Sequence, residues 1–87
     1  MAKVKVRMYA TVREAAGIPE TEVVAADLEV LLRRLAEMFG SGFSHLLAGG
    51  EGVVILVNGR TVKSGPGSGA RLSEGDEVSI FPPVSGG

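Results

Sequence analysis

The sequence contains no cysteine and no tryptophan, and His45 is its one histidine. Without cysteine the chain has no disulfide, no thiolate metal site and no thiol nucleophile. With one histidine, we do not expect a zinc cluster or a Ser-His-Asp triad built from this chain alone. The residue types therefore predict no metal site and no bound cofactor.

An excess of charge of one sign is also lacking, since nine Lys and Arg face ten Asp and Glu. The basic residues are scattered and do not alternate with the few aromatic ones, so nothing indicates a nucleic-acid partner. No apolar run approaches the roughly 20 residues of a membrane span. Charged, strand-like sequence begins at Lys3, which is unlike a signal peptide. We therefore expect a cytoplasmic protein with no membrane contact.

Apolar residues make up 45% of the 87 residues, which is typical of one globular domain with a modest core. Residues 3–10 alternate between apolar and polar types, the pattern of a half-buried strand. Residues 11–20 contain Gly17 and Pro19 and are predicted to form a turn. A second strand is expected over residues 21–26, paired with the first as a hairpin.

Asp27 is a suitable N-cap for a helix, and the residues after it carry one apolar stripe. The stripe has the spacing of a helix that faces a core, and Gly40 and Gly42 are expected to end that helix. Its members are Leu28, Leu31, Leu32, Leu35 and Phe39.

The second half of the chain is predicted to be strand-rich. Residues 43–52 are expected to form a loop, with a short helical turn at 45–47 that leaves His45 exposed. The β-branched run 53–57 is typical of a strand buried on both faces. The pair Asn58-Gly59 is a strong hairpin signal that leads into a short strand over 60–63.

A last strand is expected over residues 77–81. The glycine-rich loop 64–69 fits neither a P-loop nor a dinucleotide-binding pattern. The order strand, strand, helix, strand, short strand, strand predicts a two-layer α+β domain with one main helix across a mixed sheet. If the first and last strands pair in its middle, the topology is the β-grasp, or ubiquitin-like, fold. We expect this domain over residues 1–81 and an extended tail over 82–87.

The tail carries the candidate functional group. The two glycines at its end have no Cβ, so nothing crowds the last carbonyl carbon, and the two prolines stiffen its base. Extended, the tail reaches roughly 20 Å, enough to deliver a carboxylate into a partner's active site. The alternative is an unstructured terminus or linker. The segment reads Phe81, Pro82, Pro83, Val84, Ser85, Gly86 and Gly87.

Three segments resemble the MoaD-type sulfur carriers, the small subunits of molybdopterin synthase. Residues 9–17 (YATVREAAG) are similar to an aromatic-x-x-x-Arg-Glu-x-x-Gly segment, and residues 57–59 to a Val-Asn hairpin. Residues 72–87 (LSEGDEVSIFPPVSGG) resemble a Leu-x-x-Gly-Asp-Glu-Val segment that leads to Phe-Pro-Pro-Val-x-Gly-Gly. The tasks of Arg13 and Glu14 stay open.

The resemblance implies that a MoeB-type adenylyltransferase activates the Gly87 carboxylate with ATP and that a sulfur donor converts it to a thiocarboxylate. A MoaE-type large subunit then uses this sulfur to build the dithiolene of molybdopterin. Gly86 would keep the end of the tail thin enough for a narrow tunnel, and Phe81 would be the apolar anchor on the partner. The other residues expected to contact the partner are Pro82, Pro83, Val84 and Ser85. Tyr9 and Val62 would extend the docking face. The chain alone would catalyse nothing.

Other functions of the same end remain open at this stage. Carriers for thiazole or cysteine synthesis also end in Gly-Gly but usually lack the Phe-Pro-Pro segment. A ubiquitin-like modifier would join Gly87 to lysines of other proteins, and a passive interaction domain would need no chemistry there. From the sequence, both sulfur transfer and conjugation remain open, and so does the choice between molybdenum and tungsten. The residues name neither the activating enzyme nor the oligomeric state.

Overall fold

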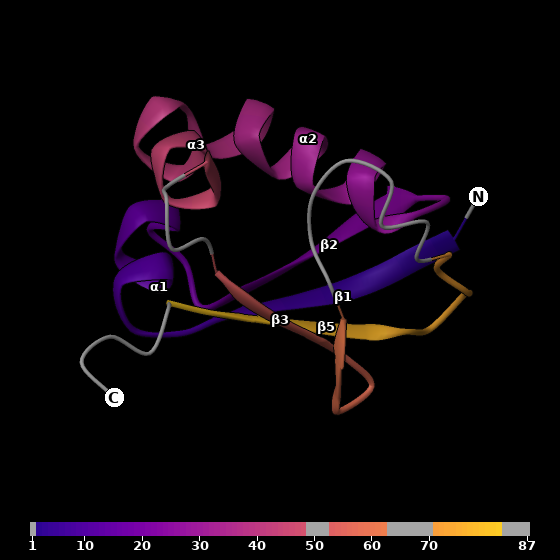
Figure 1. Ribbon diagram of the computed structural model, residues 1–87. Coiled ribbons are helices and arrows are strands. Elements are labelled where there is room, and N and C mark those ends of the chain that lie inside the picture. Colours follow the sequence, from indigo (N-terminus) through magenta and orange to yellow (C-terminus); the bar gives the residue numbers. More distant parts are fainter. Residues whose placement is uncertain (1, 49–52, 63–70, 83–87) are drawn as a thin grey trace.

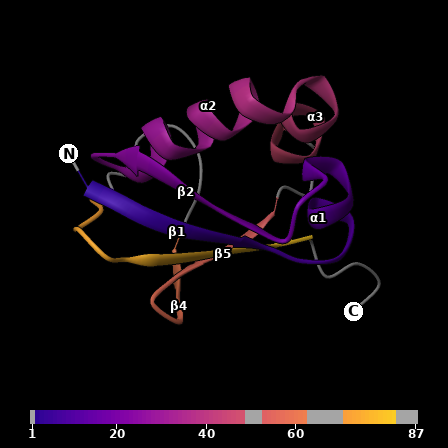
Figure 2. The ribbon, with the colours of Figure 1, turned by 180° about the vertical axis from the view of Figure 1, so that it is seen from behind.

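A computed structural model describes residues 2–48, 53–62 and 71–82 of the chain. Five strands form one sheet in the order β2-β1-β5-β3-β4, and the helices lie together on one of its faces (Figure 1, Figure 2). The elements are β1 (Ala2–Met8), α1 (Ala10–Ala16), β2 (Glu20–Ala25), α2 (Leu28–Phe39), α3 (Ser41–Ala48), β3 (Val54–Val57), β4 (Arg60–Val62) and β5 (Glu77–Phe81).

The first and last strands pair in the middle of the sheet, as the β-grasp topology requires. β1 and β5 run parallel, with Met8 opposite Ile80. The pairs β1–β2, β3–β5 and β3–β4 are antiparallel, so the sheet is mixed. The predicted two-layer α+β architecture is therefore confirmed, including the pairing of the first two strands.

Helix α2 follows from its cap and its apolar stripe. The Asp27 carboxylate accepts a hydrogen bond from the Val30 N–H at 2.9 Å, and Leu28, Leu31 and Leu35 are fully buried. At the other end Gly40 has φ +86°, a conformation that favours glycine, and its N–H bonds to the Ala36 carbonyl. The helix is thus predicted correctly from cap to cap.

The core lies between this helix layer and the inner face of the sheet. β1 and β5 contribute alternate residues, while α1 adds Val12 and α3 adds Phe43. Among the described residues no polar or charged side chain is buried. Within these same ranges no helix is long and apolar enough to cross a membrane.

The turn predicted over residues 11–20 is wrong in its first half, where α1 forms. Gly17 closes this helix with φ +83°, and its N–H bonds to the Arg13 carbonyl at 2.8 Å. A helix of 7 residues with one buried side chain, Val12, carries too little periodic pattern to be distinguished from a turn. Packing against the sheet, not local propensity, stabilises it.

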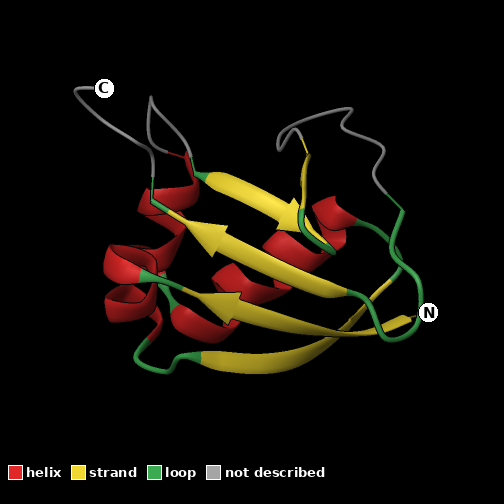
Figure 3. Ribbon diagram, turned by 90° about the horizontal axis from the view of Figure 1, so that it is seen from below, coloured by secondary structure: helices red, strands yellow, loops and turns green. Residues whose placement is uncertain are grey.

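Two further expectations are corrected. The loop expected at residues 43–52 is largely helical, because α3 covers Ser41–Ala48 and buries Phe43 against Phe39, with ring centroids 5.2 Å apart. Gly42 therefore lies inside a helix. In β3 only Ile55 is fully buried, so this strand is not buried on both faces. The described helices cover only the inner face of the sheet (Figure 3).

Candidate functional site

The candidate site is the place where the central strand β5 ends and the tail begins. Phe81 is the last residue of β5, and Pro82 follows it; both are half-buried. Because Val78 and Ile80 face the core, the alternation of the strand puts Phe81 on the outer face of the sheet. The base of the tail is therefore fixed to the middle of a five-stranded sheet.

Tyr9 lies directly beside Phe81. The Tyr9 N–H donates to the Ile80 carbonyl at 3.1 Å, which continues the β1–β5 pairing beyond the end of β1. The two aromatic rings then stack with centroids 4.3 Å apart and an angle of 6° between their planes. Such stacking holds the Phe81 ring in one orientation before any partner arrives.

Strand β3 extends this apolar surface on the other side of β5. Val54 is opposite Phe81 in the register, and Leu56 is opposite Ser79, so both lie on the outer face and both are half-buried. We call Tyr9, Val54, Leu56 and Phe81 the outer apolar patch. Sequence reasoning missed Val54 and Leu56, because a continuous apolar run does not show which of its residues the fold covers.

Charged residues form ion pairs on the outer face over β1, β2 and the start of β5. Three ion pairs join Lys3 to Glu22 at 3.7 Å, Lys5 to Glu20 at 3.8 Å and Arg7 to Glu77 at 3.8 Å. All six side chains are substantially exposed, so each pair stabilises the fold weakly. The outer face is thus divided between a charged half and an apolar half next to the tail.

Arg7 lies at the boundary of the two halves. The neighbouring Tyr9 side chain, as a hydrogen-bond partner, and then the Glu77 carboxylate raise its pKa above the ordinary value. Its Nε atom is buried and has no hydrogen-bond partner among the described residues. The guanidinium is therefore a positive charge, paired with Glu77, at the edge of the outer apolar patch.

A hydrogen-bond cluster fixes the start of β5. The Asn58 side-chain amide donates to Asp76 Oδ1 at 2.9 Å, and Asn58 Oδ1 accepts from the Glu77 N–H at 3.0 Å. Asp76 Oδ2 also accepts from the Ser73 N–H at 2.8 Å. The Ser73 N–H and then Asn58 lower the pKa of the Asp76 carboxyl. The Val-Asn-Gly and Gly-Asp-Glu-Val motifs are therefore the two halves of one structural contact.

The other predicted residues have separate places. Val62 is opposite Ile55 and packs against the core, so it is not part of the docking face. Arg13 and Glu14 are exposed on α1, and His45 is exposed on α3, as predicted for the histidine. The residues Pro83, Val84, Ser85, Gly86 and Gly87 and the loop 64–69 lie outside the described residues.

The described ranges place no three His, Cys, Asp or Glu side chains where they could hold a metal ion. The site itself consists of an apolar surface with the Arg7 cation beside it, at the base of the chain's C-terminal segment.

Comparison with known proteins places the chain among small carrier and modifier proteins. The sequence model of the ThiS family matches residues 6–87. The chain is 36% identical over 84 residues to the molybdopterin synthase sulfur carrier subunit of Escherichia coli strain K12, and the alignment covers 97% of this chain and 99% of that protein. It is 33% identical over 94 residues to small archaeal modifier protein 3 of Haloferax volcanii, with 98% and 99% covered.

Solved structures agree. The solution structure of small archaeal modifier protein 1 from Methanosarcina acetivorans superposes with a TM-score of 0.83 at 33% identity, covering 100% of this chain and 98% of that one. Subunit 1 and subunit 2 of the molybdopterin-converting factor from Helicobacter pylori 26695 form a protein–protein complex; the match to it has a TM-score of 0.70 at 27% identity, with 98% and 99% covered. Sequence and fold lead to the same result: the chain belongs to the ThiS family of ubiquitin-like β-grasp proteins, among sulfur carriers and small protein modifiers.

Proposed function

We propose that this protein is a sulfur carrier of molybdopterin synthesis, the small subunit of a molybdopterin synthase. The observation that carries the proposal is Phe81, stacked on Tyr9 at the centre of the outer apolar patch. Immediately after it comes the Pro-Pro-Val-Ser-Gly-Gly segment. The similarity to the Escherichia coli carrier subunit supports the same role.

The chemistry needed at Gly87 starts from an unreactive group. An α-carboxyl titrates near pH 3.5, so at neutral pH it is a resonance-stabilised anion and a poor electrophile. In the proposed first step a carboxylate oxygen attacks the α-phosphorus of ATP, and pyrophosphate leaves. A donor at the oxidation level of sulfide then attacks the acyl carbon, and AMP leaves. The product is a thiocarboxylate on Gly87.

Two partners are needed, because the chain supplies only the reactive end and catalyses nothing alone. A MoeB-type adenylyltransferase would carry out the activation. A MoaE-type large subunit would then cover the outer apolar patch and accept the tail; the Helicobacter pylori complex of subunits 1 and 2 supports a partner of this kind. Each sulfur transfer would return the Gly87 carboxylate, and two transfers would complete the dithiolene. Since activation consumes ATP, we place the protein in the cytoplasm.

Intact-mass spectrometry of the protein from its own host, with nothing added after Gly87, tests the carrier. We expect a species heavier by the exchange of one oxygen for sulfur, and we expect that species to be absent from a variant that lacks Gly87. The loaded protein should then restore molybdopterin formation to an extract that lacks its own small subunit. Loading without restoration would favour a carrier for thiazole or cysteine synthesis instead.

A second candidate is a protein modifier, favoured by the similarity to small archaeal modifier proteins 1 and 3. Activation would be the same, but the acyl carbon would be attacked by a lysine amine of a target protein. Tryptic digests of host proteins would then contain isopeptides that end in Gly87. If these isopeptides are found and the intact protein shows only its unmodified mass, the protein is a modifier and the sulfur-transfer proposal is wrong. A residue added after Gly87 should abolish either function.

A further inference from the structure

A second candidate surface lies at the far edge of the sheet, on β2. Met8 N–H donates to the Pro19 carbonyl at 2.9 Å, and the register places Val6 opposite Thr21 and Val4 opposite Val23. In an antiparallel pair the bonded positions recur every second residue, so Thr21 and Val23 direct their backbone groups toward β1. The N–H and C=O groups of Glu22 and Val24 therefore point to the open edge, where no described strand pairs with them.

The next outward residue along this edge already accepts a partner. The Ala26 carbonyl accepts a hydrogen bond from the Leu72 N–H at 3.0 Å, and Asp27 and Arg71 form an isolated antiparallel bridge. The edge of β2 therefore has the correct geometry for strand pairing. Among the described residues, only the segment that follows β2, Ala26 and Asp27, has such a partner. An incoming strand would continue this pairing along Val24 and Glu22.

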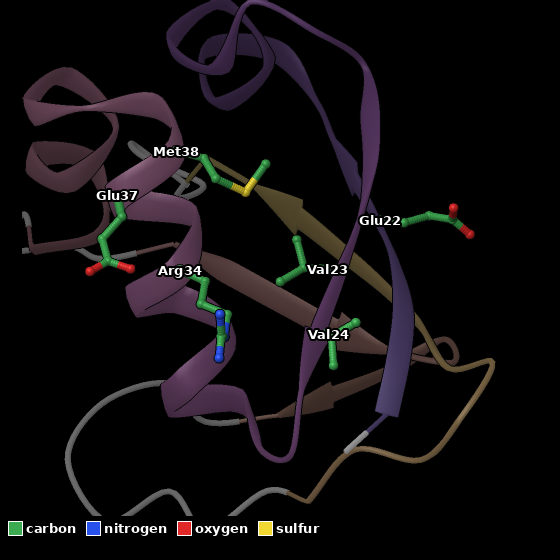
Figure 4. A pocket seen from close by; sticks show the side chains of 6 residues that line it. All are labelled: Glu22, Val23, Val24, Arg34, Glu37 and Met38. Atoms are coloured by element: carbon green, nitrogen blue, oxygen red, sulfur yellow. The ribbon is translucent and has the colours of Figure 1, made fainter.

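A groove of about 450 Å³ runs beside the open edge, between β2 and α2. Val23 and Met38 project into this space from the two sides (Figure 4). Met38 is 50% exposed, which is a large fraction for an apolar side chain, and Val23 beside it is 6% exposed. The groove lining is completed by Glu22, Arg34 and Glu37.

Of the three charged side chains that line the groove, the two carboxylates point away from it (Figure 4). Glu22 points away from α2 and pairs with Lys3, while Glu37 points away from β2 (Figure 4). Arg34 lies one helical turn before Met38, on the same face of α2. It takes part in none of the ion pairs between described residues, whereas its neighbour Arg33 pairs with Glu29 at 3.7 Å. The groove therefore combines an apolar floor with one available cation.

We propose that this edge binds an extended segment of a partner protein, which adds a strand beside β2. Its backbone would pair with Glu22 and Val24, its helix-facing apolar residues would cover the exposed side chain of Met38, and an acidic residue would pair with Arg34. This site is separated from Phe81 by β1, so a partner held here leaves the tail free. The chain would then carry a recruitment surface in addition to its reactive end.

The chain's own segments fit this groove poorly. The helix-facing residues of β2 are Thr21, Val23 and Ala25, so a second copy of this strand offers no carboxylate to Arg34. Segment 82–84 reads Pro-Pro-Val and lacks two of the N–H groups that pairing requires. A partner segment of apolar residues with a nearby Asp or Glu satisfies both the backbone and the charge.

Two synthetic probes test the proposal by NMR titration of the ¹⁵N-labelled full chain. One is a capped eight-residue peptide of alternating valine and threonine that carries one aspartate, and the other has lysine in place of the aspartate. We expect saturable shifts of the Glu22 and Val24 amides, with the aspartate peptide binding about tenfold more tightly. Arg34→Glu should reverse this preference, while the matched change Arg33→Glu, outside the groove, should leave it intact.

N-methylation of the aspartate peptide tests the strand pairing. Methyl groups on the residues whose N–H faces β2 should abolish binding, and methyl groups on the alternate residues should not. The proposal is overturned if neither peptide binds, if the preference survives Arg34→Glu, or if the shifts map to the outer apolar patch. It is equally overturned if the Glu22 and Val24 amides broaden with protein concentration, because a second copy then occupies the edge.

Discussion

At the scale of single residues, the Tyr9–Phe81 stack connects the fold to the tail. Both residues are half-buried, so the rings are held by the sheet and are still available to a partner. An aromatic anchor of this kind contributes about 2–4 kcal/mol at an interface. Phe81→Ala should therefore weaken binding to the large subunit at least about thirtyfold, as measured by titration calorimetry.

The matched control is Ile18→Ala, which removes a partly exposed apolar side chain that belongs neither to the outer apolar patch nor to the groove beside β2. We expect it to leave the affinity for the large subunit unchanged. Both variants should keep the circular dichroism spectrum of the parent protein. An unchanged dissociation constant for Phe81→Ala would move the anchor to another part of the chain.

Ala10 shows strain at the next residue along from Tyr9. Its φ of +52° is one that residues with a Cβ adopt at a cost of about 1–2 kcal/mol. Ala10→Gly removes that cost but adds entropy to the unfolded chain, so we expect a net gain of up to about 1 kcal/mol in unfolding free energy. The same exchange at Ala15, inside α1, should lower it by about 1 kcal/mol. Urea denaturation measures the unfolding free energy of both variants. An equal loss of unfolding free energy in Ala10→Gly and Ala15→Gly would argue against strain at Ala10.

At the scale of elements, the cluster around Asn58 and Asp76 joins the β3–β4 hairpin to β5. Hydrogen bonds lower the pKa of Asp76 in the folded state, so the carboxylate stabilises the fold above its unfolded pKa of about 3.9. That stability is lost as the pH falls through the lower, folded pKa. Asp76→Asn should lower the unfolding free energy at neutral pH and flatten its decline in acid. Urea titrations at neutral pH and near pH 3 measure both effects.

Asn58→Gly breaks the same cluster from the other side. Glycine keeps the positive φ of +52° that this turn position needs, so the variant removes the side-chain hydrogen bonds without straining the turn, and the entropy it adds to the unfolded chain does not depend on pH. We expect a loss of about 1 kcal/mol at neutral pH, which shrinks in acid as Asp76 becomes protonated. A loss that is independent of pH would show that Asn58 acts through the turn and not through Asp76.

The helices and strands differ in how far the local sequence pattern predicts them. The cap at Asp27 and the leucine stripe predict α2, and alternation predicts β1, because in both cases one face is buried along the whole element. Helices α1 and α3 depend on single buried residues, Val12 and Phe43, and such contacts exist only after the sheet has formed. The resemblance to the sulfur carriers implies Phe81 as an anchor, whereas Val54 and Leu56 require the register of β3 with β5.

At the scale of the whole molecule, the parallel pairing of β1 with β5 decides where the C-terminal segment leaves the sheet. The last strand lies between two others, so Phe81 and Pro82 leave from the centre of the sheet and not from an edge. Local patterns do not fix a pairing between the two ends of a chain, so from the sequence this pairing is only the condition under which the order of elements gives a β-grasp fold. A partner that binds the outer apolar patch would therefore lie next to Phe81 and Pro82, where the tail begins.

In the proposed function, the end of the tail is the part that would enter an enclosed site of the partner. Gly86→Leu adds a branched side chain next to the reacting residue, so we expect it to block thiocarboxylate formation when the chain is incubated with ATP, a sulfide source and the adenylyltransferase. Ser85→Leu places the same bulk one residue farther from the acyl carbon and should be loaded at a higher rate than Gly86→Leu. Intact mass gives the yield, and both variants should unfold in urea like the parent. Normal loading of Gly86→Leu would show that the partner's site does not require a thin end.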